Sequence, residues 1–524
     1  MRRSLLPALL LAGLRLSAQT PTWSDDVACI FYSHCTTCHR PGGISGEELD
    51  LMSYDEAHAH RSDISDYVSA GVMPPWPPDQ QYRAMAHPRV LAQDEIDLIA
   101  SWAAGGGPEG DVANAPPPPT YTSSWSITDP DISTRMPDYT IPTLTSDMYR
   151  AFVLHVDIPA DVFIRRFEVI PGNTAVVHHV LVYQDTTGQA QQLDDADADP
   201  GYVSFGGIGV NEAELVGLWA PGASAWTAPP GMGVLLHAGA DIVIQVHYPE
   251  ASEGLLDSTR VNFELDPSPI VRPLAIAAPL EHTITMTDGP LIIAPNTVRT
   301  FHNQYTVTFP ATITSVGPHA HLLCQRMKAF AVLPSNDTVP LIDIPHWDFH
   351  WQGLYDFRKP IFLPIGTVLH GEATYDNTAD NGENPNDPPD WVTLGEATTD
   401  EMMLFYFAYT LGVAADTNTV IDDSMHPPHY LDCAPTTQVG ISEALLHESI
   451  RLFPSPAHER FTVSADRDGC QLVLLNAQGE QVLGTRIARG DNVIEAGGRS
   501  AGAYIAVVRD RGGSVLFRAP IVLQ

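Results

Sequence analysis

The chain has 524 residues, which is enough for three or four domains of ordinary size, each with its own hydrophobic core. Asp and Glu number 63 against 27 Lys and Arg, which gives a formal net charge of −36 at pH 7. This acidic balance argues against nucleic acid or an anionic membrane as the main partner, because both are themselves negatively charged.

Residues 1–19 have the layout of a secretory signal peptide. Arg2 and Arg3 precede an apolar stretch of about ten residues, and small residues follow near Ala18. The stretch is too short to span a bilayer, and we find no other candidate membrane span. We therefore expect an exported protein that crosses the periplasm and ends outside the cell or on its surface, where disulfides can form.

Residues 20–112 carry helical patterning and the first chemical motif. HCTTCHR places Cys35, Cys38 and His39 in the C-x-x-C-H pattern, in which two thiols bond to the haem vinyl groups and the histidine binds the iron. The alternatives are half of a zinc site and a redox-active dithiol. The nearby sequence shows neither a second zinc-ligand pair nor the βαβ pattern of a thioredoxin-like site.

The second axial ligand of the haem iron is predicted to be Met73, in AGVMPPWPPD, where two prolines stiffen the loop. The other candidates are Met52, Met85, His58, His60 and His87. CTTCHRPGG, VMPPW and LAQDEIDLIASWAAGGGPEGD together resemble the small cytochrome c domains that bacteria attach to exported oxidoreductases. This resemblance implies one covalently attached haem c.

The Pro-rich segment 113–124 is predicted to be a linker. After it, the helical patterning gives way to a pattern typical of β-strands. From 125 to 435, short runs such as FIRRFEVI, DIVIQVHY and MMLFYFAYTL alternate with Pro, Gly, Asn and Asp. That pattern predicts antiparallel β-sandwiches. The region is long for a single sandwich, so we expect a division near Asp266–Pro279, giving domains at 125–272 and 273–435.

Histidines recur along this β-rich region, together with one candidate thioether. They are His178 and His179 in TAVVHHVLVY, His247 in IQVHYPE, His319 and His321 in GPHAHLL, and Met402 in TTDEMMLFYF. TAVVHHVLVY otherwise reads as a buried strand, and neighbouring strand residues point to opposite faces. His178 and His179 can therefore converge on one ion only if the strand ends or twists there.

The second group has a more favourable spacing, because residues i and i+2 of a strand face the same way. His319 and His321 can thus share one ion. Imidazole suits several transition metals, and the soft sulfur of Met402 favours copper, above all Cu(I). The alternative is that these are ordinary core or surface histidines.

Six motifs occur in an order that resembles the copper type II, ascorbate-dependent monooxygenases, which include peptidylglycine hydroxylating monooxygenase and dopamine β-monooxygenase. They are VVHHVLVY, WAPG at 219–222, QVHY, PHAHLL, YDN at 375–377 with NPNDPP at 384–389, and DEM at 400–402. The resemblance covers residues 125 to 435. It implies two jelly-roll-like β-sandwich domains, each holding one copper, that face each other across a solvent-filled cleft.

The resemblance also assigns ligands to two copper ions. His178, His179 and His247 would hold the electron-transfer copper. His319, His321 and Met402 would hold the copper at which dioxygen is activated.

The chain departs from the peptide-hydroxylating members at their substrate anchors. Gly317 stands where those members have an arginine, and Leu404 stands where they have an asparagine. Tyr406 matches their tyrosine and is a candidate catalytic residue. Without the bidentate arginine, a terminal carboxylate has no partner there. We expect a less polar or differently anchored small molecule as substrate, in place of peptidylglycine.

The expected reaction inserts one atom of O₂ into a substrate C–H bond and reduces the other to water, which consumes two electrons. The haem could supply them from an external donor, in place of ascorbate or alongside it. The alternatives are a non-catalytic haem and copper electron carrier, a copper-binding surface protein, and a structural or adhesive protein with relic sites.

The remaining cysteines and the C-terminus complete the sequence. Cys324 and Cys433 are the predicted disulfide, while Cys29 and Cys470 have no predicted mates. A linker is expected at 436–449. Residues 450–524, with LFPSPAHERFTV and AGAYIAVV, resemble the β-sandwich sorting domain of the bacterial type IX secretion system. The resemblance implies the secretion machinery as a partner. The alternative is an ordinary β-sandwich accessory module.

Overall fold

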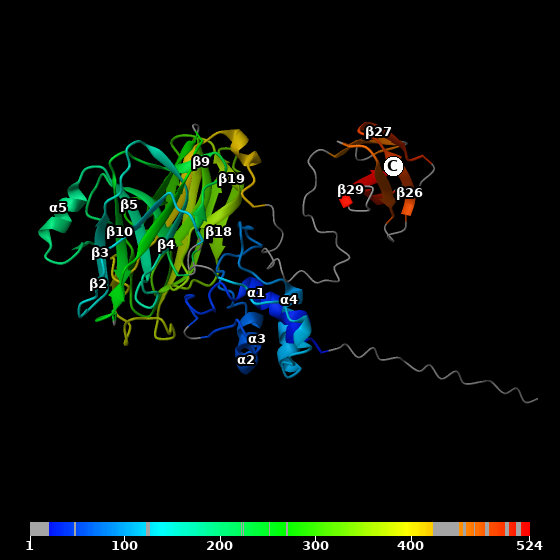
Figure 1. Cartoon of the computed structure of the whole chain (residues 1–524). Helices are drawn as coiled ribbons and strands as arrows, with labels where there is room; N and C mark the ends of the chain where they lie inside the picture. Colours follow the sequence, from blue (N-terminus) through cyan, green and yellow to red (C-terminus); the bar gives the residue numbers. More distant parts are fainter. Residues whose placement is uncertain are drawn as a thin grey trace, which may run out of the picture. The chain divides into compact units, whose positions relative to one another are not determined.

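The computed structural model describes residues 20–422 and 450–523, apart from gaps at 47–48, 122–125, 222, 224, 251, 269–270, 454–456, 459, 466, 477–480, 498–501 and 510–514. The predicted signal peptide, the 436–449 linker and Cys433 lie outside the described residues. The chain divides into two compact units, Met1–Cys433 and Ala434–Gln524. The structure is mainly β, and its helices are concentrated near the N-terminus (Figure 1).

The N-terminal region contains a π-helical turn and four α-helices. They are η1 (Trp23–Val27), α1 (Ala28–His34), α2 (Tyr54–Ala59), α3 (Arg61–Ser69) and α4 (Gln93–Ala104). Trp23 packs edge-on against Phe31 with ring centroids 5.0 Å apart, and both contact Trp102. The carboxylate of Glu95 accepts the backbone N–H of Ala92 at 2.8 Å, which caps the start of α4. This aromatic core fixes how the short helices pack.

The β-rich region begins with twelve strands and one helix. They are β1 (Ile132–Arg135), β2 (Tyr139–Thr140), β3 (Met148–Leu154), β4 (Val162–Ile170), β5 (His179–Asp185), α5 (Gln189–Ala196), β6 (Tyr202–Val203), β7 (Glu214–Trp219), β8 (Trp226–Thr227), β9 (Met232–Leu236), β10 (Asp241–Tyr248), β11 (Leu256–Asp257) and β12 (Arg260–Leu265).

Ten further strands follow. They are β13 (Arg272–Leu280), β14 (Ile292–Ile293), β15 (Thr297–Thr306), β16 (Ala311–His319), β17 (Cys324–Val332), β18 (Thr338–Ile344), β19 (Tyr355–Leu363), β20 (Val368–Asn377), β21 (Val392–Thr393) and β22 (Leu404–Leu411). Two short 3₁₀ helices, Val112–Asn114 and Ala414–Asn418, lie before and after the β-rich region.

One sheet runs through both halves of this region. Its order is β1-β12-β4-β9-β13-β22-β16-β19, with β8 paired to β4. Strand β13 pairs with β9 in parallel on one side and with β22 antiparallel on the other. A second sheet, β6-β3-β10-β5-β7, packs on the first half, and β15-β20-β17-β18 packs on the second. The result is two β-sandwiches joined by hydrogen bonds through β13.

Alternation along the strands separates the two cores from a shared pocket. In β5, Val180 and Val182 are fully buried in the first core, while Leu181 and Tyr183 line the pocket. In β22, Phe405 and Phe407 lie in the second core, while Leu404 and Tyr406 line the same pocket. The period of two in a strand therefore supplies core residues from one face and site residues from the other.

The second unit is a separate small β structure. Its strands are β23 (Arg451–Phe453), β24 (Arg460–Ala465), β25 (Cys470–Leu475), β26 (Gln481–Ile487), β27 (Gly490–Glu495), β28 (Gly502–Arg509) and β29 (Val515–Leu523). They form a sheet β23-β24-β27 and a sheet β26-β25-β28-β29. Phe461, Leu472 and Ile521 are buried in its own core.

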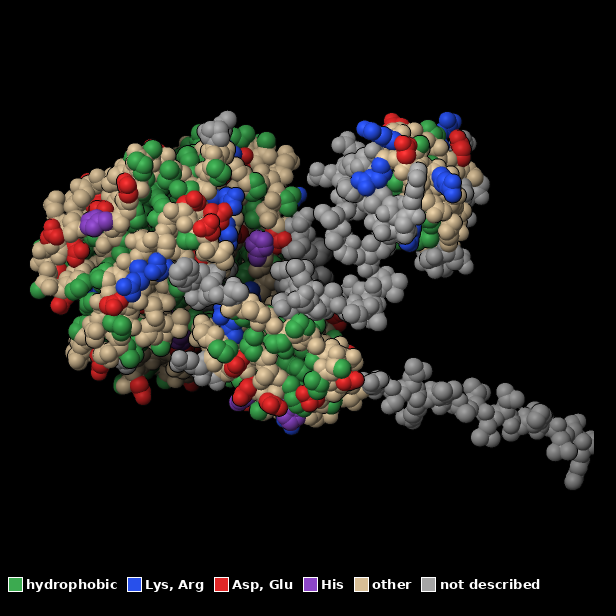
Figure 2. All heavy atoms as spheres, viewed as in Figure 1, with side chains coloured by type: hydrophobic (Ala, Val, Ile, Leu, Met, Phe, Trp, Pro, Cys, Tyr) green, Lys and Arg blue, Asp and Glu red, His purple; other side chains and the backbone are tan. Residues whose placement is uncertain are grey.

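In the part of the chain that the structure describes, no helix has both the length and the apolar character needed to cross a bilayer. Asp and Glu side chains are spread over the visible surfaces of both units, in keeping with the acidic composition (Figure 2).

Candidate metal centre

Three histidines predicted from the sequence lie together at the ends of two paired strands. Strand β5 begins at His179, so His178 precedes the strand and is free of its alternation. His179 lies opposite His247 of β10, and the backbone N–H of His178 donates to the His247 carbonyl at 2.9 Å. The doublet converges because the strand starts between its two members.

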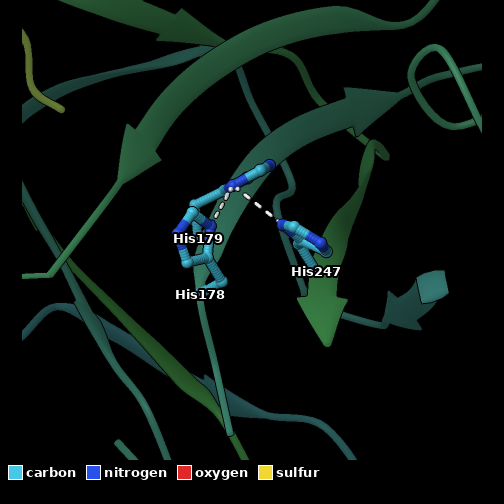
Figure 3. A group of neighbouring side chains, drawn as sticks. All are labelled: His178, His179 and His247. Atoms are coloured by element: carbon cyan, nitrogen blue, oxygen red, sulfur yellow. Dashed lines mark hydrogen bonds between the residues drawn. The ribbon is translucent and has the colours of Figure 1, made fainter. Parts of the chain in front are cut away.

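The three imidazoles turn the same ring nitrogen toward a common point (Figure 3). Nδ1 of His179 lies 3.2 Å from Nδ1 of His178 and 3.3 Å from Nδ1 of His247. Nitrogens bound to one metal ion at about 2.0 Å with tetrahedral angles stand roughly 3.3 Å apart. The donor set therefore fits a transition-metal ion. Among the described residues, this is the one group of three or more His, Cys, Asp and Glu close enough to hold a metal.

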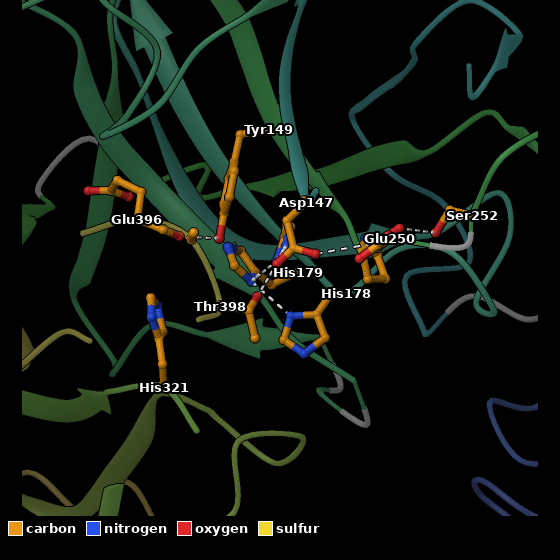
Figure 4. Close-up of polar contacts among 12 residues, drawn as sticks. Asp147, Tyr149, His178, His179, Glu250, Ser252, His321, Glu396 and Thr398 are labelled. Atoms are coloured by element: carbon orange, nitrogen blue, oxygen red, sulfur yellow. Dashed lines mark hydrogen bonds and ion pairs between the residues drawn. The ribbon is translucent and has the colours of Figure 1, made fainter. Parts of the chain in front are cut away.

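The surroundings of His247 fix the orientation of its ring, and Figure 4 shows three of the neighbouring side chains, Asp147, Tyr149 and Thr398. Its Nε2 lies 3.3 Å from the carboxylate of Asp147, which also accepts from the hydroxyl of Thr398. Tyr149 stacks on the other side of the ring, with centroids 4.2 Å apart. A proton held on Nε2 by a carboxylate leaves the Nδ1 lone pair for a metal, which is the arrangement that second-shell partners impose in metal sites.

Burial would raise the pKa of the Asp147 carboxyl, but hydrogen bonds from His247 and Thr398 outweigh it and hold that pKa below its usual range. Asp147 therefore keeps its negative charge beside His247.

The second histidine pair presents the opposite nitrogen. Strand β16 ends at His319, and His321 follows in the next turn, with ring centroids 5.3 Å apart. His319 Nδ1 is 2.6 Å from the side-chain oxygen of Gln352, and His321 Nδ1 is 3.1 Å from the carbonyl of Asp400. Because those oxygens only accept, both Nδ1 atoms must carry the proton. The lone pairs of both rings therefore lie on Nε2, available to a ligand.

Met402 lines the same pocket as His319. Glu401 locks the two ligand segments together, since its carboxylate accepts the backbone N–H groups of His321 at 2.9 Å, Leu323 at 2.7 Å and Met402 at 3.1 Å. The hydroxyl of Tyr375 donates to the Met402 carbonyl at 2.6 Å. Met403, by contrast, is fully buried in the core of the second sandwich. The neighbouring methionines thus have distinct environments.

The two ligand groups face each other. His179 and His319 have ring centroids 6.3 Å apart, and both line a pocket of about 230 Å³ between the two sandwiches. The hydroxyl of Tyr149 donates to the carbonyl of Glu396 at 3.1 Å, which ties the first sandwich to the loop that precedes Met402. Four of the six predicted copper ligands, His178, His179, His319 and Met402, therefore line one pocket. The other two are buried beside it, since the His247 ring contacts His179 and the His321 ring contacts His319.

The rest of the pocket wall is aromatic and aliphatic. It includes Leu181, Tyr183, Trp219, Phe349, Leu404 and Tyr406, together with the carboxylate residue Glu396. Among the described residues, no Lys or Arg lines it. Gly317 also lines it, opposite Tyr406 across the β16–β22 pair, and a Cβ at Gly317 would meet the Gly353 carbonyl at 3.3 Å.

Burial holds His178, His179, His319 and His321 in their neutral form. Burial lowers the pKa of His178 and of His321 to about 3, and neighbouring histidines add to the effect. Burial also lowers the pKa of His319 to about 4, against the hydrogen bond to Gln352. Burial keeps the pKa of His179 well below its usual value as well. Neutral imidazole is the form that binds a metal ion.

The haem-motif residues lie at the end of α1. The backbone N–H groups of Cys38 and His39 both donate to the Cys35 carbonyl, at 3.1 and 2.9 Å, which forms a tight turn. His39 Nδ1 lies 3.2 Å from the Leu49 carbonyl, so Nδ1 carries the proton and Nε2 the lone pair. Burial raises the pKa of the Cys35 thiol to about 12, the opposite of an activated dithiol.

Met73 packs against the same apolar core as Cys35, and its role as the axial ligand stays a prediction. Met85, one of its rivals, is fully buried in the core of the second sandwich and pairs with Phe357, so it is excluded. The donor chemistry at Cys35, Cys38 and His39 thus fits a c-type haem. The predicted Cys324 disulfide remains a prediction, since Cys433 lies outside the described residues.

Several site residues were not predicted from the sequence. Asp147, Tyr149, Phe349 and Gln352 reach the histidines from loops or strands that carry no recognisable motif. His282 also lines the pocket, where its Nδ1 accepts the Met403 N–H at 3.2 Å. Of these supporting residues, only Glu401 could have been found from the sequence, because it is the central residue of the DEM motif.

Comparison with protein-family models and with curated proteins finds no match. Among solved structures, PorZ, a surface component of the type-IX secretion system of Porphyromonas gingivalis, is 16% identical over 16% of this chain and 13% of its own, with a TM-score of 0.14. PNGase F, a glycosylasparaginase from Flavobacterium meningosepticum, is 9% identical over 54% of this chain and 97% of its own, with a TM-score of 0.22. The VP2 particle of infectious bursal disease virus is 11% identical over 55% and 73%, with a TM-score of 0.16. TM-scores this low carry no argument about function.

Proposed function

We propose that the chain is an exported copper-dependent monooxygenase that hydroxylates a C–H bond of a small molecule with O₂. His178, His179 and His247 would hold one copper, and His319, His321 and Met402 would hold the other. The observation that carries the proposal is the convergence of His178, His179 and His247 beside a pocket that His319 and Met402 also line. Hydrogen bonds at Nδ1 of His319 and His321 leave the lone pairs of these two rings on Nε2.

Copper is the metal best matched to this donor set. The first group offers three neutral imidazoles and the second offers two imidazoles and a thioether, with no thiolate or carboxylate among the proposed ligands. Imidazole alone would also suit zinc, but the soft sulfur of Met402 favours copper. Bound copper would supply the one-electron redox chemistry that O₂ reduction requires.

The chain's own residues would bind and orient the substrate. Leu181, Trp219 and Leu404 give the pocket an apolar wall that excludes water from the C–H bond. Burial raises the pKa of the Tyr406 hydroxyl to about 12, so it stays protonated and can donate a hydrogen bond to the substrate. Because none of the described residues that line the pocket is a Lys or Arg, we propose an uncharged substrate over one anchored by a carboxylate.

The haem region would complete the electron supply. Cys35, Cys38 and His39 would attach and ligate one haem c, with Met73 as the second axial ligand. An external donor, ascorbate or another reductant, would provide the electrons. We further propose that residues 450–524 direct the chain to a secretion machinery.

The test compares two adjacent methionines. Met402→Leu removes the thioether at nearly constant volume, whereas Met403→Leu makes the same change in the neighbouring core. With ascorbate and a panel of small apolar substrates, O₂-dependent product formation should be lost in Met402→Leu and kept in Met403→Leu. Equal activity of the two variants, or no turnover in the wild type with any substrate, would contradict a monooxygenase and leave the haem and copper electron carrier.

A further inference from the structure

One loop of the second sandwich contacts both histidine groups. We call residues 345–353, between β18 and β19, the bridging loop. The ring of Phe349 stacks on His178 with centroids 4.6 Å apart and planes 18° from parallel, and it meets His321 edge-on at 5.9 Å. Gln352 of the same loop accepts the proton of His319. The bridging loop is therefore in direct contact with both groups of proposed ligands.

The other side of the bridging loop faces the helical region. A second cavity, of about 520 Å³, is lined by Val72 and Trp76 from the helical region and by Trp347 and Trp351 from the bridging loop. Val72 is the neighbour of Met73, whose side chain packs into the helical core. Phe349 lines both cavities, so its ring lies between the Met73 loop and the histidines.

The helical region is fixed at this place. The backbone N–H of Asp79 donates to the Asp343 carbonyl and that of Ala86 to the Asp356 carbonyl, both at 2.8 Å. Met85 is fully buried in the second sandwich, and Trp76 packs edge-on against Tyr355 with centroids 5.4 Å apart. Backbone pairing and a buried anchor of this kind hold the Met73 loop against the sandwich, which a flexible tether would not do.

We infer that the bridging loop is the route by which electrons pass from the haem region to the histidine groups, with Phe349 as the contact that delivers them to His178. This inference rests on the proposed function. A haem held by Cys35, Cys38, His39 and Met73 would supply one electron per event, passing from the ferrous to the ferric state. A copper ion held by His178, His179 and His247 would accept that electron, passing from Cu(II) to Cu(I), and no covalent bond would change. An external one-electron donor would then reduce the haem again.

The physical reason lies in the packing. Electron tunnelling weakens steeply with distance, and it is more efficient through atoms in van der Waals contact than across a water-filled gap. The stacked Phe349 and His178 rings provide such contact on the copper side. On the other side of the bridging loop, the aromatic side chains of Trp347 and Trp351 line the cavity that Val72, next to Met73, also lines.

The experiment follows electron transfer within the full-length holoprotein, separately from turnover. Without O₂, the haem is reduced by a brief pulse of reductant, and its reoxidation is recorded by absorbance while the Cu(II) signal is recorded by electron paramagnetic resonance. Phe349→Leu and Trp347→Leu should slow haem reoxidation several-fold. Phe309→Leu is the matched control, because Phe309 lies in the same sandwich, is partly exposed and contacts Tyr409 instead of the site.

A structural role alone would not give this pattern. Copper content, the Cu(II) spectrum and direct reduction of copper by ascorbate should be unchanged in Trp347→Leu, which lies outside the histidine pocket. If Phe349→Leu loses copper, the haem reoxidation rate of Trp347→Leu alone decides the test. Rates equal to the Phe309→Leu control in both variants would overturn the inference. Absence of haem-to-copper transfer in the wild type would also overturn it, yet ascorbate-driven hydroxylation would then still support the proposed function.

Discussion

His179 of the first sandwich faces His319 of the second with ring centroids only 6.3 Å apart and planes at 76°. Both histidine groups therefore contribute residues to one small pocket, where the family resemblance implies two sites across a solvent-filled cleft. Their approach is maintained by contacts between the sandwiches, including the hydrogen bond from Tyr149 to the Glu396 carbonyl. Electron exchange between ions held by these groups would need no long path.

This proximity predicts a magnetic interaction. Oxidised protein with both groups loaded should show a broadened or weakened Cu(II) resonance, because two unpaired spins would lie close together. The variant His321→Leu, which keeps the first group intact, should restore the sharp signal of an isolated ion. Identical line shapes at full and half loading would contradict the close approach.

Asp147→Asn should weaken copper binding at the first histidine group alone. The carboxylate orients the His247 ring and increases the basicity of its Nδ1, and loss of such a partner typically lowers metal affinity about 10- to 100-fold. Competitive chelator titration measures the affinity. Asp241→Asn is the control, because Asp241 pairs with His155 on the surface, at 2.8 Å. Equal copper affinities in the two variants would show that Asp147 does not support copper binding by His247.

Glu401→Gln should destabilise the metal-free protein by about 1–3 kcal/mol, the usual cost of leaving buried hydrogen-bonding groups unsatisfied. A glutamine keeps one accepting oxygen but turns an NH₂ group toward backbone N–H donors. Urea unfolding of the chelated protein measures the change in free energy. Glu253→Gln, at an exposed position, should be neutral. A neutral result at Glu401 would mean that its carboxylate does not organise the ligand segments.

The metal-free protein should lose stability in acid through its buried histidines. The pKa of His319 is about 4 when folded and about 6.5 when unfolded, so between these values the unfolded chain binds a proton that the folded chain does not. Its contribution therefore falls as pH falls through that window, by about 1.4 kcal/mol per pH unit.

Two buried carboxyls increase the stability of the folded protein as pH falls, the opposite of the histidine effect. Burial raises the pKa of Glu401 to about 8 and that of Asp356 to about 6, so the folded chain binds these protons more tightly than the unfolded chain does. The measurement is therefore the difference in unfolding free energy between wild type and His319→Gln, in which these carboxyls are the same. That difference should change with pH between 6.5 and 4. Parallel pH profiles would show that His319 titrates normally in the fold.

The sequence predicted the β-rich character and the grouping of His178, His179 and His247, because strands and ligand motifs leave local signals. For His178 and His179 to converge, the strand had to begin or twist between them, and β5 begins at His179. The residues that hold the histidine rings in place could not be predicted from the sequence. Asp147 and Gln352 meet their histidines only through tertiary contacts, 100 and 33 residues away in the chain. The pairing of β13 with both sandwiches likewise depends on edges that no local pattern marks.

Copper content tests the central claim most directly. Purified protein, loaded with copper and then dialysed, is analysed for metal per chain in the wild type and in variants of each histidine group. We predict two copper ions per chain in the wild type, one in His247→Ala and one in His319→Ala. Absence of stoichiometric copper in the wild type, or equal content in all three proteins, would contradict the account.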